Sequence, residues 1–183
     1  MRWSVLLVVV ATILLGGCTL NRAPNALLTA PAEYALDTGD VVRVTVYGDT
    51  TITNTYTVTD KGTINVPLAG PVQVRGRTIT AAEQMITRLL ADGYMISPKV
   101  SVEITTYRPF FIDGAVNNSG QFPYVWGMTA RAAVATAGGF KDFADRTHLT
   151  LYRKTGKGTI KLSIPLETTI RPGDTLVAED RWF

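Results

Sequence analysis

The sequence predicts an α+β fold built from two small, strand-rich modules, in each of which one helix covers a sheet. Short stretches of alternating apolar and polar residues recur along the chain, and only two stretches have the apolar spacing of a helix. Glycine-containing turn signals separate these stretches. The length of 183 residues and the 46% hydrophobic content are sufficient for one or two compact cores.

The first residues have the pattern of an export signal. A basic start at residues 1–3 precedes an apolar run over residues 4–15, and two glycines then stand before Cys18. The apolar run is shorter than a membrane-spanning helix requires. We therefore expect residues 1–17 to form a signal peptide that is removed. Residues 18–31 lack a regular apolar period and are predicted to be a tether.

Cys18 is the only cysteine of the chain, and the run Leu15-Gly16-Gly17-Cys18 resembles the lipobox of bacterial lipoproteins. The resemblance implies that Cys18 starts the mature chain and carries acyl chains, which would hold this lipidated tether stably at a membrane. Thr19 follows, and under the usual sorting rule for lipoproteins a residue other than Asp favours the outer membrane, with the body in the periplasm. The alternative is an ordinary signal followed by an unrelated cysteine.

The first predicted module covers residues 32–107. Residues 42–46 alternate between apolar and polar side chains, which predicts a half-buried strand. Residues 55–59 and 63–66 repeat this alternation on either side of Asp60-Lys61-Gly62. We expect these two segments to pair as a hairpin, because the glycine can supply the positive φ of the turn.

A helix and a last strand complete the first module. The capping-box pattern Thr80-Ala81-Ala82-Glu83 predicts the start of a helix that ends before Gly93. An alternating strand over residues 100–104 follows, and the module closes near Tyr107. The helix is predicted to pack one apolar face on the sheet, formed by Ala82, Met85, Ile86, Leu89 and Leu90. Truncation of Leu89 would then cost about 2–5 kcal/mol.

The second predicted module covers residues 108–183. A helix is expected over residues 130–137, because Thr129 can cap its start and Gly138-Gly139 ends it. Its small residues allow it to lie close either to its own sheet or to a neighbouring subunit. Alternation and turn signals predict strands over residues 110–116, 122–124, 149–152, 160–164 and 175–178, with a hairpin turn at Gly156-Lys157-Gly158.

Composition argues against several classes of function. The net charge of +3 falls to +2 without residues 1–17, which contain one Arg and no acid, and it is too small and scattered for nucleic-acid binding. One Cys and one His exclude a disulfide framework and a metal site built from several such residues. We therefore expect no nucleic-acid partner, no metal and no cofactor.

No set of residues has the pattern of a catalytic site. Gly156-Lys157-Gly158-Thr159 lacks the first glycine of a phosphate-binding loop, because that position is Leu151, and a strand follows where the loop needs a helix. His148 has Asp142 and Asp145 nearby, but no Ser or Cys nucleophile motif accompanies it. We therefore expect that the protein is not an enzyme and has no catalytic residue.

Several motifs follow one another in an order that can be compared with a known family. The first module contains Tyr34-x-Leu36-Asp37-x-Gly39-Asp40, then Gly62-x-Ile64-x-Val66-Pro67, then Pro98-x-Val100-x-Val102. The second contains Gly114-Ala115-Val116-x-x-Ser119-Gly120, Ala135-x-Ala137-Gly138-Gly139, Leu151-Tyr152-Arg153 and Arg171-Pro172-Gly173-Asp174. This order resembles the bacterial outer-membrane polysaccharide export proteins. One departure is Ser119, where that family commonly has proline.

The resemblance implies a polysaccharide export domain over residues 32–107. It also implies a soluble-ligand-binding β-grasp domain over residues 108–183, which include the closing segment Arg181-Trp182-Phe183. A Gly-Asp pair precedes a strand in each of the two domains. Structural roles are implied for the following motif residues: Tyr34, Gly39, Asp40, Gly62, Pro67, Gly114, Gly120, Gly138, Gly139, Gly173 and Asp174.

The resemblance further implies a homo-oligomeric ring on the periplasmic face of the outer membrane, through which capsular or exopolysaccharide passes. The implied partners are this polysaccharide and an inner-membrane copolymerase. Because larger relatives end in a membrane helix that this sequence lacks, we expect a short family member that needs a separate outer-membrane pore. Guanidinium groups and aromatic faces suit sugars, so possible polysaccharide contacts are Arg75, Arg77, Tyr107 and Arg108. The alternatives are a monomeric envelope lipoprotein that binds glycan or peptide, and a periplasmic glycan hydrolase.

Overall fold

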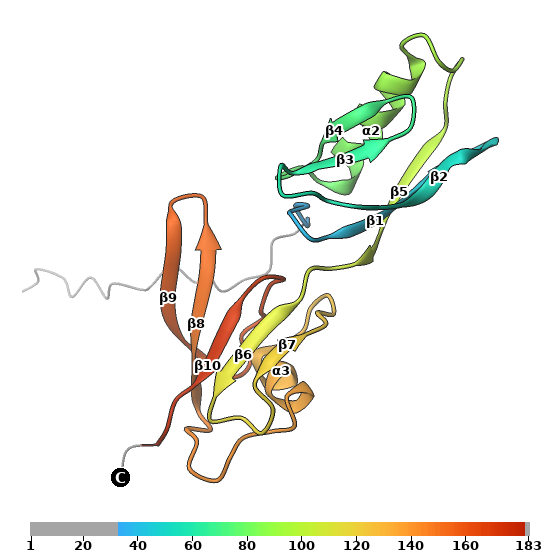
Figure 1. The fold of residues 1–183 in the computed structure, drawn as a ribbon. Coiled ribbons are helices and arrows are strands. Elements are labelled where there is room, and N and C mark those ends of the chain that lie inside the picture. Colours follow the sequence, from blue (N-terminus) through green and yellow to red (C-terminus); the bar gives the residue numbers. More distant parts are fainter. Residues whose placement is uncertain (1–32, 182–183) are drawn as a thin grey trace, which may run out of the picture.

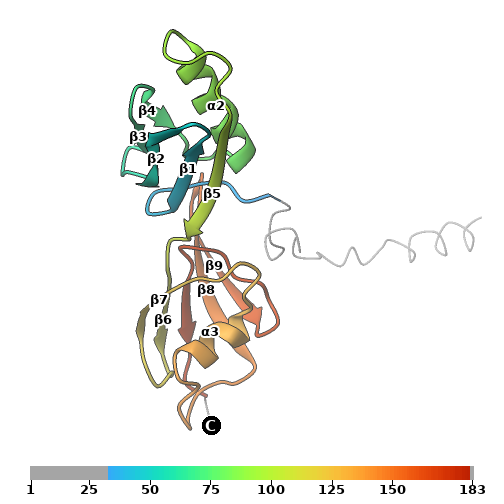
Figure 2. The ribbon, with the colours of Figure 1, turned by 90° about the vertical axis from the view of Figure 1, so that its right-hand side faces the viewer.

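The structure is a computed structural model that describes residues 33–181 as two lobes joined end to end (Figure 1, Figure 2). The predicted signal peptide, the proposed anchor Cys18, the tether and the last two residues lie outside the described residues. Each lobe combines strands with one helix, so the predicted α+β class is confirmed. Within the described part of the chain, neither helix is long and apolar enough to cross a membrane.

The first lobe contains a three-stranded antiparallel sheet, a separate hairpin and a helix. Its elements are β1 (Val41–Val46), β2 (Asp49–Thr57), β3 (Thr63–Val66), β4 (Gly70–Gln73), α2 (Ile79–Ala91) and β5 (Val100–Thr106). In the sheet, β1 lies between β2 and β5, and the hairpin pairs β3 with β4. Buried valines, isoleucines and leucines from all six elements form one core.

The predicted pairing of residues 55–59 with 63–66 is wrong. The turn is present, because the Thr59 amide donates to the Thr63 carbonyl at 2.9 Å, but β3 then pairs with β4. Residues 55–57 of the segment before the turn belong to β2, which pairs with β1 on both sides of a register shift. Pro71 concealed β4 in the sequence, since proline weakens a strand pattern, yet this two-stranded hairpin has open edges that tolerate it.

Helix α2 begins two residues earlier than the capping-box pattern predicts. The hydroxyl of Thr78 accepts a hydrogen bond from the Ala81 amide at 3.2 Å and caps the helix. The buried stripe consists of Ala82, Ile86 and Leu90, spaced four residues apart. The predicted burial of Leu89 is wrong: it lies beside this stripe and is 38% exposed, because the contact with the sheet is narrower than the apolar pattern.

The positions of Leu89 and Leu90 lead to a prediction about stability. Leu90 is fully buried, so Leu90→Ala should lower the free energy of unfolding by about 2–5 kcal/mol through lost burial and a cavity. Leu89→Ala removes the same atoms from a partly solvated site and should cost less than about 1 kcal/mol. Urea unfolding followed by circular dichroism measures both. Equal losses would contradict the orientation of α2.

The second lobe is a five-stranded sheet with one helix. Its elements are β6 (Phe110–Gly114), β7 (Gly120–Phe122), α3 (Ala130–Thr136), β8 (His148–Thr155), β9 (Gly158–Pro165) and β10 (Thr175–Ala178). The strand order is β7-β6-β10-β8-β9, and β6 runs parallel to β10 while the other neighbours are antiparallel. The predicted β8–β9 hairpin is confirmed, and it extends beside the junction of the lobes (Figure 1).

Helix α3 forms where the sequence predicts it and covers the second sheet (Figure 2). Its start is capped by the Thr129 hydroxyl, which accepts from the Ala132 amide at 3.3 Å. The face formed by Ala130, Ala133 and Val134 is buried in the core of its own lobe, together with the strands of the sheet. The sequence left open whether the small residues of this helix pack on its own sheet or on a neighbouring subunit. The buried face packs on its own sheet.

Candidate binding cleft at the module junction

The two lobes are joined by only three residues, Tyr107, Arg108 and Pro109, between the end of β5 and the start of β6. Each lobe forms a hydrogen bond with the backbone of this connection. The Arg108 amide donates to the Asp40 carboxylate at 2.9 Å, and the Pro109 carbonyl accepts from the Gly173 amide at 2.9 Å. The connection is therefore fixed from both sides by hydrogen bonds.

The turns that hold the connection have the same local structure. In the segments 37–40 and 171–174, the amide of the final aspartate donates to the first carbonyl at 3.1 Å, and its carboxylate accepts from the first amide at 2.8 and 2.7 Å. The third residue of each is glycine, with φ of +90° and +82°. Asp40 and Asp174 are both buried. The Gly-Asp pairs noticed in the sequence are thus equivalent turns.

Arg108 lies between these two turns. A Cβ atom at Gly173 would stand 2.9 Å from the Arg108 Nε, and one at Gly39 would stand 3.5 Å from the Arg108 Cβ. Both glycines therefore leave room for this side chain as well as supplying the positive φ. The arrangement explains why a Gly-Asp pair is useful at the edge of each lobe that faces the connection.

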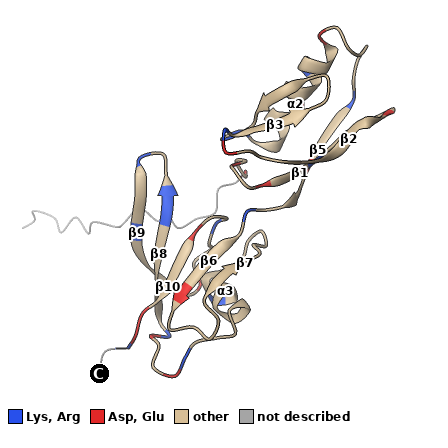
Figure 3. Cartoon of the chain, viewed as in Figure 1, with Lys and Arg blue, Asp and Glu red and all other residues tan. Residues whose placement is uncertain are grey.

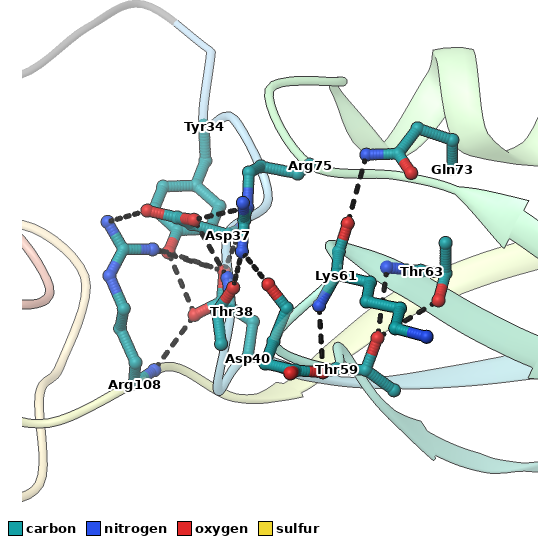
Figure 4. Close-up of polar contacts among 11 residues, drawn as sticks. Tyr34, Asp37, Thr38, Asp40, Thr59, Lys61, Thr63, Gln73, Arg75 and Arg108 are labelled. Carbon is teal, nitrogen blue, oxygen red and sulfur yellow. Dashed lines mark hydrogen bonds and ion pairs between the residues drawn. The ribbon is translucent and has the colours of Figure 1, made fainter. Parts of the chain in front are cut away.

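The guanidinium of Arg108 joins a partly buried polar network in the first lobe (Figure 4). The Tyr34 hydroxyl donates to the Asp40 carboxylate at 2.7 Å and accepts from the Arg108 Nη1 at 2.6 Å. Arg108 also forms ion pairs with Asp40 at 3.3 Å and with Asp37 at 3.5 Å. Burial strongly raises the pKa of Tyr34, although Arg108 opposes this shift, so the hydroxyl keeps its proton and remains a donor.

Arg75 extends the network toward solvent. Its Nε lies 3.3 Å from the Asp37 carboxylate, and its Nη2 donates to the Thr38 hydroxyl and to the Asp60 carbonyl (Figure 4). The side chain remains 44% exposed, so it forms part of the surface of the junction. Gly62 is required beside it, because a Cβ atom there would stand 2.5 Å from the Arg75 Cβ.

The second lobe has a buried ion pair at the same junction. Arg153 donates from Nε to Asp174 Oδ1 at 2.9 Å and from Nη2 to Oδ2 at 2.6 Å, and both side chains are less than 5% exposed. This two-point geometry is the strongest form of a carboxylate–guanidinium contact. This pair was not predicted from the sequence. Its signal is that Arg153 occupies an inward-facing position of β8, in register with the buried Leu149 and Leu151.

Aromatic rings from both lobes meet at the junction. Tyr107 packs edge-on against Tyr34 at 5.0 Å and against Tyr124 at 5.6 Å, and it stacks on Trp126 at 5.8 Å, all measured between ring centroids. The Tyr124 hydroxyl donates to the Ile170 carbonyl at 3.0 Å. Burial raises the pKa of both Tyr107 and Tyr124. Trp126 is 42% exposed, so the cluster presents an aromatic surface to solvent.

These residues border a cleft of about 640 Å³ between the lobes. Its walls combine aromatic rings with charged groups, and the basic side chains outnumber the acidic ones by five to two. Basic segments of β8 and of the β5–β6 connection lie at this level of the molecule (Figure 3). The main side chains of the walls are Tyr34, Asp37, Arg75, Arg108, Phe111, Tyr124, Trp126, Arg153, Lys154, Arg171 and Asp174. Such a surface suits a polar ligand with apolar ring faces.

Comparison with known protein families assigns the two lobes separately. Residues 28–105 match the family described as polysaccharide biosynthesis/export protein, and residues 109–160 match the SLBB domain. The chain belongs to the polysaccharide export protein family. Among the described residues, the gap between the two matches coincides with the connection that Arg108 and the Gly-Asp turns hold.

Curated proteins with related names are similar to large parts of this chain. An exopolysaccharide production protein, ExoF, of Rhizobium meliloti (strain 1021) is 29% identical over 65% of this chain and 31% of its own length. The EPS I polysaccharide export outer membrane protein EpsA of Ralstonia nicotianae is 25% identical over 86% of this chain and 48% of its own. The polysialic acid transport protein KpsD of Escherichia coli is 27% identical over 58% and 20%. The chain thus spans less than half the length of these relatives.

The residues that the sequence suggested as polysaccharide contacts of this export-family protein do not all lie in the cleft. Arg75 and Arg108 line the cleft, and Tyr107 is the centre of the aromatic cluster beside it. Arg77 is exposed but does not line the cleft. Sequence reasoning missed Trp126 and Lys154, because residues distant in the sequence meet only through the packing of the two lobes.

The other motif residues of the family lie either in the Gly-Asp turns at the junction or away from the cleft. Tyr34, Gly39, Asp40, Gly173 and Asp174 form the junction described above. Gly114 and Gly138 are close to neighbouring atoms, with Cβ atoms that would stand 2.2 Å from the Ala178 carbonyl oxygen and 2.6 Å from the Asn118 Nδ2. The positions with more open surroundings are Pro67, Gly120 and Gly139.

The side chains of Asp142, Asp145 and His148, in which the sequence shows no catalytic pattern, lie on the surface of the second lobe. Asp142 forms an ion pair with Arg146 at 3.6 Å, and the Asp145 carboxylate accepts from the Thr147 amide at 2.7 Å. Hydrogen bonds from Thr147 lower the pKa of Asp145. His148 is exposed at the start of β8. Among residues 33–181, no group of three or more His, Cys, Asp or Glu side chains could hold a metal ion.

Proposed function

We propose that this protein is a component of a channel that exports capsular or exopolysaccharide across the bacterial envelope. The observation that carries the proposal is the order of a polysaccharide export domain and an SLBB domain, joined by a short and strongly held connection. We assign the domains to residues 32–107 and 108–183. Relatives named for exopolysaccharide production, EPS I polysaccharide export and polysialic acid transport support this role.

In this proposal the protein is anchored at the outer membrane by acyl chains on Cys18, after removal of residues 1–17. The lipobox-like run before Cys18 supports the anchor. The outer membrane is also the location named for the relative EpsA. Acyl chains would add membrane affinity in proportion to their buried length. The tether of residues 18–31 then places the two domains at the periplasmic face.

The proposed assembly is a homo-oligomeric ring. Each sheet has strands with one unpaired edge, β2 and β5 in the first lobe and β7 and β9 in the second. Such edges favour contact with other chains, and a closed ring can cover them. The proposed partners are an inner-membrane polysaccharide copolymerase and an outer-membrane pore. The role is transport of the polymer, without catalysis.

Polysaccharide contacts are proposed at the junction. Arg75, Arg108 and Tyr107 combine guanidinium groups with an aromatic surface, which suits hydroxyl and carboxylate groups on flat sugar rings. Arg77 has its side chain on a separate exposed surface, where it would contact polymer only at the rim of the assembly.

A complementation experiment tests the proposed function. A strain that lacks this protein should still polymerise the sugar but should fail to display it at the surface. The parent chain should restore surface polymer, whereas Cys18→Ser should remain in the soluble periplasmic fraction and restore much less. Cross-linking in the complemented cells should give species larger than dimers. Normal surface polymer in the deletion strain, with no paralogue present, would refute the export role, and a strictly monomeric protein would favour an envelope binding lipoprotein.

A further inference from the structure

Three side chains of the junction cleft keep surface that a ligand can reach. Lys154, in the last part of β8, lines the cleft and is exposed, and no described residue forms an ion pair with its ammonium group. Trp126 and Phe111 also line the cleft and keep 42% and 41% of their surfaces open to solvent. An open cation and two open aromatic rings in one cleft are therefore available to a ligand.

The charges of the cleft favour an anion. Its acidic groups are already engaged: Asp37 pairs with Arg75 and Arg108, and Asp174 pairs with Arg153. The basic side chains of the lining exceed the acidic ones by three, so the remaining field is positive. A concave surface with walls of low polarity concentrates that field on a bound ligand.

The aromatic rings favour a ligand with flat apolar faces. Their negatively polarised faces attract the C–H groups of a sugar ring, and their large area loses water on contact. The volume of about 640 Å³ lies within the range of about 300–1,000 Å³ that is usual for sites of small ligands. The cleft can therefore receive a short saccharide and leave the rest of a polymer in solvent.

We propose that the cleft binds a short segment of an acidic glycan, with a sugar ring on Trp126 and a carboxylate group at Lys154. The exposed guanidinium of Arg75 borders the same cleft and adds a second anion contact. This inference rests on the proposed export function and names the class of polymer that the protein handles, a polysaccharide with carboxylated sugars. A neutral glycan would offer no opposite charge to the Lys154 ammonium.

Binding of trigalacturonate tests the proposal directly, with its fully methyl-esterified form as the neutral control. The two probes have the same rings and differ in charge. The full-length chain in detergent micelles should bind trigalacturonate in isothermal titration calorimetry about tenfold or more tightly than the ester. Added salt should weaken binding of the acid and leave the ester unaffected, because ions screen the charges of the open cleft.

Matched variants locate the site. Lys154→Gln should weaken trigalacturonate binding about fivefold or more, whereas Lys99→Gln, an exposed lysine at the far end of β5, should leave it unchanged. Trp126→Ala should weaken binding of both probes, and Tyr94→Ala, which removes an exposed ring from the α2–β5 loop, should not. Melting temperatures check that the variants are folded, and Lys154→Gln decides the outcome even if Trp126→Ala is unstable.

Three results would overturn the proposal: no saturable binding of trigalacturonate, equal affinity for the ester, or equal loss in Lys154→Gln and Lys99→Gln. The export function is measured separately, as surface polymer in the deletion strain. A strain that needs the protein for surface polymer, combined with a purified chain that does not bind the acid, would reject the cleft proposal alone. Normal surface polymer without the protein would reject the export function instead.

Discussion

Asp174→Ala is expected to lower the free energy of unfolding by about 3–5 kcal/mol, because it leaves the Arg153 guanidinium buried without its carboxylate. Both side chains are less than 5% exposed, so water cannot replace the lost partner. The substitution also removes the acceptor of the Arg171 amide, which is bonded to Asp174 Oδ2 at 2.7 Å. Urea unfolding of the full-length chain, followed by circular dichroism, measures the loss.

The matched control for Asp174 is Glu167 in the same lobe. Arg131 and Glu167 form an ion pair with the same N–O distance of 2.6 Å, but their side chains are 62% and 71% exposed. Glu167→Ala should therefore cost only about 0–1 kcal/mol, since solvent screens an exposed pair. Equal losses for the two substitutions would show that burial of the Arg153–Asp174 pair has no energetic effect.

A double substitution separates the buried charge from the lost hydrogen bonds. Combining Arg153→Met with Asp174→Leu removes both charges and keeps apolar volume, so most of the loss seen in Asp174→Ala should be recovered. The loss that remains includes the bond between the Arg171 amide and Asp174. A double variant as unstable as Asp174→Ala would mean that the loss of the carboxylate beside the buried guanidinium is not the main cost.

Strands with a clear two-residue alternation were predictable from the sequence. The segments that became β1, β5, β8 and β9 all alternate apolar with polar side chains, and this period is a local property. β4 was missed because Pro71 interrupts the pattern and a tight turn at Leu68 precedes it. The partner of β3 was mistaken because strand pairing depends on the packing of the whole lobe rather than on the nearest turn.

The candidate site was only partly predictable, because it is made of residues that are distant in the sequence. Residue chemistry alone pointed to Arg75, Arg108 and Tyr107, which lie at the junction. Trp126 and Lys154 have no local pattern that distinguishes them from other surface residues, and they reach the cleft only because the second lobe folds against the connection. The alternation of β8 did contain a usable signal, since Arg153 stands at an inward-facing position.

Gly114→Ala is expected to be among the most destabilising single substitutions, with a loss of more than about 4 kcal/mol. Gly114 ends β6 with φ of +87°, and a Cβ atom there would stand 2.2 Å from the Ala178 carbonyl oxygen. That oxygen belongs to β10, the parallel neighbour of β6, and accepts from the Ala115 amide at 2.8 Å. Alanine at this position therefore forces two central strands apart and breaks the hydrogen bond that joins them.

Gly127→Ala is the control that separates this steric clash from backbone strain. Gly127 has a nearly identical φ of +81°, but a Cβ atom there would meet nothing within 4 Å. It should cost only about 1–2 kcal/mol, the usual penalty for an L-residue in the left-handed region. The difference between the two substitutions, measured by urea unfolding of the full-length chain, is the cost of separating β6 from β10. If the two losses were the same, contact with Ala178 would not be the reason for glycine at position 114, and its φ alone would account for it.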